Sequence, residues 1–150
     1  MAQLVSTTIA INGNPVSQFS SFSLTQGIFD HHFFRLTCPA ESIDGAMGAI
    51  FSQSGDLMGA TLSAQISSVD MEGQMRFSGI ITQVETEKFN GFSGDVVISG
   101  YSPTIVLDSG PHCKSWEKKA VKNIVNDVLK HFPQNLLQPK VSPVYGETLA

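Results

Sequence analysis

Hydrophobic and polar residues alternate along much of the first hundred positions of the chain. The opening segment places four residues on one face: Val5, Thr7, Ile9 and Ile11. A period of two is expected of a strand with one buried face. Asn12-Gly13 follows, and Asn-Gly is the dipeptide that a type I′ hairpin turn favours. We therefore predict a hairpin whose returning strand covers residues 16–26. Phe22 and Leu24 would share one face of it, and Phe19, which is out of phase, predicts a bulge.

The same alternation predicts further strands over residues 31–38, 60–66, 75–87 and 92–101. The first of these carries four residues on one face: His32, Phe34, Leu36 and Cys38. Pro39 should end that strand, because proline cannot donate to a sheet ladder. Residues 41–59 combine helical spacing with several glycines, which predicts a short helix or an irregular crossover. Six or seven short strands indicate a small antiparallel or mixed β-barrel, or a sandwich.

The pattern changes after Ser102-Pro103, where apolar residues recur at spacings of three and four. Such spacing predicts one apolar stripe on a helix, for which we expect Ser115 as N-cap and Pro133 just beyond the end. The predicted packing stripe consists of Trp116, Val121, Ile124, Val125, Val128 and Leu129. The expected fold class is mainly β with one C-terminal amphipathic helix (α+β). We expect a barrel over 1–105, a turn and capping helix over 106–132, and a linker or the start of another element over 133–150.

Composition and charge narrow the possible functions. Hydrophobic residues make up 41% of the chain and charged residues 15%, which indicates a packed core and not a disordered chain. The net charge is −4 and the lysines and arginines are dispersed, so we expect no nucleic-acid partner. The sequence has no basic segment followed by an apolar run at its start and no long apolar stretch. We therefore expect synthesis in the cytoplasm without a signal peptide, and no stable membrane insertion.

Candidate chemistry is sparse. The residues that could in principle gather around zinc are His31, His32, Cys38, His112 and Cys113. Structural zinc sites usually take two ligands from one tight turn, and this spacing is absent. No G-x-S-x-G elbow or phosphate-binding loop occurs. Glu85 and Glu87 share a strand face, where exposed acids more often guard a sheet edge than act as acid and base. We expect no catalytic, cofactor-binding or metal-binding residue, and no enzymatic activity.

The order of four segments resembles a known family. These segments are residues 11–36, a hairpin leading into an aromatic strand; 77–85; 100–116; and 118–129, a helix of the pattern V-x-x-I-V-x-x-V-L. Together they are similar to the N-terminal region of the VgrG family, the spike of type VI secretion systems. This region is related to late-control D proteins and baseplate hubs of contractile phages. The resemblance covers about residues 1–135, and Tyr101-Ser102-Pro103 resembles the variant systems of Bacteroidetes.

The resemblance implies a structural component of a contractile injection machine that docks on the secreted tube. It implies a homotrimer in the full-length protein, with an Hcp-like tube protein, baseplate components and secreted effectors or adaptors as partners. The machine would expel the chain from the cell. Two alternatives stay open, a tail-tube-like ring subunit and a small-ligand-binding β-barrel.

Overall fold

The computed structural model describes residues 5–43, 55–68, 74–89, 92–110 and 113–137. The chain divides into two compact units, Met1–Ser102 and Pro103–Ala150. The first unit holds the sheet, and the second holds most of the helical residues. No helix in the described part of the chain is long and apolar enough to cross a membrane.

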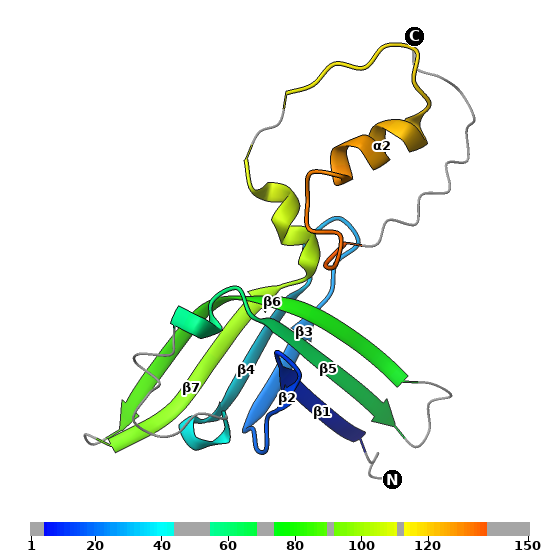
Figure 1. The fold of residues 1–150 in the computed structure, drawn as a ribbon. Helices are drawn as coiled ribbons and strands as arrows, with labels where there is room; N and C mark the ends of the chain where they lie inside the picture. Colours follow the sequence, from blue (N-terminus) through cyan, green and yellow to red (C-terminus); the bar gives the residue numbers. More distant parts are fainter. Residues whose placement is uncertain (1–4, 44–54, 69–73, 90–91, 111–112, 138–150) are drawn as a thin grey trace. The chain divides into compact units, whose positions relative to one another are not determined.

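One antiparallel sheet of seven strands forms the first unit (Figure 1). Its strands are β1 (Val5–Ile11), β2 (Asn14–Pro15), β3 (Ser21–Thr25), β4 (Phe33–Pro39), β5 (Thr61–Ser68), β6 (Gln74–Phe89) and β7 (Phe92–Tyr101). Their order across the sheet is β2-β1-β5-β6-β7-β4-β3. A short 3-10 helix, η1 (Ala40–Ser42), follows β4. The predicted mainly β class is confirmed.

The sheet curls into a half-barrel, and the chain itself explains why (Figure 1). In a flat sheet of seven strands the edge strands β2 and β3 would lie about 29 Å apart. Residues 16–20 connect these two edges directly and can span at most about 21 Å. The backbone N–H of Ser20 donates to the carbonyl of Thr37 at 2.7 Å, so the connection lies against β4. The edges are therefore held closer together than a flat sheet allows.

The concave side of the half-barrel contains the hydrophobic core. Phe34, Leu36 and Cys38 of β4 are fully buried, so their predicted shared face is confirmed. The other buried members of the core cluster are Ile9, Ile11, Val16, Ala40, Ala60, Leu62, Ala64, Phe77, Ile81, Val96 and Ile98. Alternation places the residues between them on the outer face of the sheet.

The predicted type I′ turn is present, but the predicted returning strand is shorter. Asn12 and Gly13 have φ angles of 49° and 84°, the two positive values that this turn requires. The returning strand β2 has only two residues, and Pro15 ends it because proline has no N–H to continue the ladder. The prediction of one strand over residues 16–26 is therefore wrong. Phe19 lies in the crossing segment and packs against the core, so no bulge is needed there.

In the second unit the helix is shorter than predicted. The unit contains a 3-10 helix, η2 (Pro103–Asp108), and the helix α2 (Val121–Leu129) with Ala120 as N-cap. Ser115 as N-cap is therefore wrong. Lys118 has a φ of 52°, a left-handed conformation that a continuous right-handed helix excludes. Trp116 accordingly precedes the helix. That α2 caps the barrel, and the domain limits drawn from the sequence, stay predictions.

Phe34 occupies a slot that two glycines leave open. In the sheet register Phe34 lies beside Gly100 of β7, and Gly100 lies beside Ile81 of β6. A Cβ added at Gly79 would lie 2.5 Å from Cε1 of Phe34. A Cβ added at Gly100 would lie 2.9 Å from the same atom and would overlap the carbonyl oxygen of Ile80. The Phe34 ring therefore spans from β4 across β7 to β6.

The slot predicts the effect of small substitutions. Gly79→Ala should lower the free energy of unfolding by about 1–3 kcal/mol, because the added methyl group overlaps the Phe34 ring. The loss should shrink in a Phe34→Leu background, since the shorter side chain leaves room. Gly55→Ala is the control, because nothing lies within 4 Å of a Cβ at that position. Urea unfolding followed by far-UV circular dichroism measures both. Equal midpoints for Gly79→Ala and Gly55→Ala would contradict the slot.

Candidate interaction surfaces

The described residues do not bring together a metal site. No group of three or more His, Cys, Asp or Glu side chains in the described ranges could hold a metal ion. Cys38 is buried in the core, whereas Cys113 is exposed, and both are free thiols. His112 lies outside the described residues. The chain's lack of enzymatic activity and of cofactors stays a prediction.

The Cys38 thiol is held in its neutral form. Burial, and then the negative charge of Asp95, raise its pKa to about 11. A thiol must lose its proton to act as a nucleophile or a metal ligand. Cys38 therefore acts as a small apolar core residue near neutral pH.

Charged side chains span β7 on the outer face of the sheet. Arg35 of β4 and Glu85 of β6 form an ion pair with 3.6 Å between nitrogen and oxygen, and Gln83 donates to Glu85 at 2.8 Å. Val97 and Ser99 of β7 lie between these strands and are 3% and 6% exposed. The pair itself is half-exposed, and such pairs contribute at most about 1 kcal/mol. Its neighbour Glu87 has a side chain outside the described set.

The loop between β3 and β4, residues 26–32, exposes two large apolar side chains. Ile28 is 93% exposed and Phe29 is 102% exposed. Hydrogen bonds hold the base of the loop: the N–H of His32 donates to Oγ of Ser102 at 3.1 Å, and the N–H of Ser102 donates to the carbonyl of His32 at 2.8 Å. Gly27 donates its N–H to Nδ1 of His32 at 3.4 Å. The loop therefore presents an apolar tip on a fixed base.

A groove of about 320 Å³ crosses strands β1, β5 and β6. Its lining residues are Thr8, Ala10, Ser63, Ala64, Gln65, Arg76 and Phe77. Ala64 and Phe77 belong to the core, and the other five alternate with core residues, so the groove opens on the outer face. Neighbouring Gln65 and Gln74 are joined at its rim by a side-chain hydrogen bond of 2.7 Å. The groove thus combines short side chains with one cation, Arg76.

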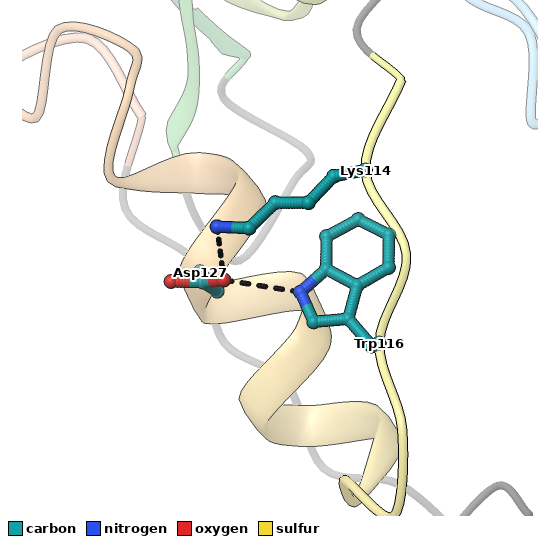
Figure 2. Close-up of polar contacts among 3 residues, drawn as sticks. All are labelled: Lys114, Trp116 and Asp127. Carbon is teal, nitrogen blue, oxygen red and sulfur yellow. Dashed lines mark hydrogen bonds and ion pairs between the residues drawn. The ribbon is translucent and has the colours of Figure 1, made fainter.

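In the second unit, Asp127 ties the segment before α2 to the helix (Figure 2). One carboxylate oxygen, Oδ2, accepts from Lys114 Nζ at 2.7 Å and from Trp116 Nε1 at 3.0 Å. The Lys114 ammonium lies 5.9 Å from the centre of the Trp116 ring. The hydrogen bonds from Lys114 and then from Trp116 hold the pKa of Asp127 well below its usual range.

The other stripe residues predicted from the sequence lie on α2 and are partly accessible. Val121 is 38% exposed, and four are half-buried: Ile124, Val125, Val128 and Leu129. Trp116 is half-buried beside the helix and not on it. What this stripe packs against stays a prediction.

Sequence reasoning missed the β3–β4 loop and the outer groove. The signal for the loop was present: Ile28 and Phe29 are consecutive apolar residues between Gly27 and Asp30, outside any alternating run. The groove had no comparable signal, because its lining comes from three strands that only the folded sheet places side by side.

Comparisons with known proteins identify the fold. No family model and no curated protein matches the sequence. Among solved structures, the chain is similar to the crystal structure of the tail protein from Neisseria meningitidis MC58, with a TM-score of 0.57 and 16% sequence identity. The match covers 96% of this chain and 42% of that protein, so the chain spans about two fifths of its neighbour's length. The chain therefore has a tail-protein-like β fold.

The hydrogen bonds that Asp127 accepts from Lys114 and Trp116, here called the Asp127 cluster, predict how fluorescence depends on pH. The emission of Trp116, the single tryptophan, should resist acid. A lowered carboxyl pKa contributes stability above the ordinary value of 3.8, and this contribution is lost only as the pH falls through the lower folded value. Trp116 fluorescence should therefore stay constant from pH 7 to pH 4 and change below that. In Asp127→Asn this acid transition should disappear.

Asp56→Asn, which alters an exposed carboxyl in the first unit, is the control and should keep the transition. Far-UV circular dichroism at each pH separates loss of the cluster from general unfolding. An emission change centred at pH 4, or one retained in Asp127→Asn, would contradict the assigned hydrogen bonds.

Proposed function

We propose that this chain is a structural module of a contractile, phage-tail-like injection machine, specifically the N-terminal hub region of a VgrG-like spike. The observation that carries the proposal is the structural similarity to a tail protein over 96% of the chain. The order of the sequence segments at residues 11–36, 77–85, 100–116 and 118–129 supports the narrower assignment to a spike. Similarity at 16% identity establishes a fold and not a role, so the role is our proposal.

The proposal names the partners and the place of action. Three copies of the full-length protein would form a ring that docks on the end of an Hcp-like tube, beside baseplate components. Effectors or adaptors would be carried with the spike. The chain would be made in the cytoplasm and expelled by the machine. The curled sheet is compatible with this arrangement, because its strands turn one face to the core and leave the other face available to neighbouring subunits.

A tail-tube-like ring subunit is the second candidate. The neighbour is described only as a tail protein, and this description fits a hub and a tube subunit equally. The two differ in number and position, because a hub lies at one end of the tube whereas tube subunits repeat along it.

Gold labelling of tail-like particles tests the proposed function. An epitope tag on the chain, expressed in cells that encode it, would be detected with gold-conjugated antibody on purified particles by electron microscopy. A hub should be labelled at one end of each particle. Label along the whole tube would favour the ring subunit, and particles without label would contradict both. An untagged strain is the control.

A further inference from the structure

The tip of the β3–β4 loop has the properties of a protein-binding surface. Ile28 and Phe29 are 93% and 102% exposed, and Asp30 directly follows them. Oδ1 of Asp30 accepts the N–H of His31 at 2.9 Å, which fixes the carboxylate beside the apolar pair. Adjacent large apolar side chains held in water on a fixed loop are typical of a protein contact.

The groove on β1, β5 and β6 has the complementary properties. Its short side chains, such as Ala10 and Ser63, leave space on the outer face, and Arg76 provides a cation there. Arg76 is exposed and forms no ion pair within the described ranges of the chain. A planar guanidinium packs well on an aromatic ring and pairs with a carboxylate.

We propose that residues 28–30 of one copy dock into the groove of a second copy, with Phe29 against Arg76 and Asp30 paired to the Arg76 guanidinium. This inference rests on the proposed function, since it supplies the subunit contact of the proposed ring. The partner is a second copy because the loop carries an acid beside an aromatic ring and the groove carries the matching cation. The contact is not made within one copy, since Ile28, Phe29 and Arg76 are all exposed.

The placement of the two surfaces determines the kind of assembly. The loop joins β3 and β4 at one side of the sheet, whereas the groove lies on β1, β5 and β6 toward the other side. A contact between two different surfaces is head-to-tail, and repeated head-to-tail contacts form a closed ring or an open filament. The proposed contact is therefore head-to-tail, and it closes into a ring where the rotation between successive copies allows closure.

Charge exchange tests the contact in the full chain. Sedimentation equilibrium of the wild type should show association that depends on concentration. Asp30→Arg and Arg76→Asp should each raise the dissociation constant at least about tenfold, because each places like charges together. The double variant Asp30→Arg/Arg76→Asp should associate at least about threefold more tightly than either single variant, since the ion pair is restored in reverse while the Phe29–Arg76 contact stays lost. Phe29→Ser should also raise the constant at least about tenfold through loss of the aromatic anchor.

Asp56→Arg makes the same change of charge as Asp30→Arg on an exposed residue outside both surfaces, and it should leave association unchanged. Circular dichroism checks that each variant is folded. A wild type that stays monomeric, or a double variant that associates no better than the single ones, would overturn the docking contact. Gold labelling at one end of particles would in that case leave the proposed function standing, so the two failures are distinguishable.

Discussion

The packing of Phe34 into the space above Gly79 and Gly100 is the constraint on which the sheet depends. The ring is fully buried and lies 5.8 Å from the Phe77 ring in an edge-to-face arrangement. One side chain of β4 thus contacts the strands β7 and β6 at once, and a side chain at either glycine would prevent this. The slot admits the ring at only one relative position of the three strands, because a shift by one residue would turn Phe34 to the outer face. The part of the core on these strands and the outer-face ion pair across β7 rely on that register.

Much of the sheet could be predicted from the sequence, because a strand with one buried face leaves a period of two. Phe34 and Leu36 alternate with Phe33 and Arg35, and the structure buries the first pair and not the second. The Asn12-Gly13 turn was predicted because its chemistry is local. The early end of β2 has a local cause in Pro15, but the crossing that follows, from one edge of the sheet to the other, leaves no residue pattern. The late start of α2 depends on the backbone conformation of one lysine, and no residue pattern indicates it.

The candidate surfaces were less predictable than the strands, for a physical reason. Exposure is a property of the whole fold. The sequence around Phe29 is equally compatible with a buried ring, and only the folded sheet shows that Phe29 lies on an exposed loop. The Trp116–Asp127 hydrogen bond joins residues eleven positions apart across a bend at Lys118, whereas the sequence pattern put Trp116 on the helix. Alternation requires only that apolar residues occupy every second position, and it does not require particular residues. Two sequences with little identity can therefore form the same tail-like fold. The alternation of polar and apolar residues therefore indicates the strands but not the exposed loops.

Native mass spectrometry of the purified chain over a range of concentrations tests the central claim, that this fold serves assembly and not small-molecule binding. The account predicts head-to-tail oligomers that gain population as the concentration rises and carry no additional bound mass. A monomer that retains a co-purifying small molecule at every concentration would contradict it, and would favour a ligand-binding half-barrel instead.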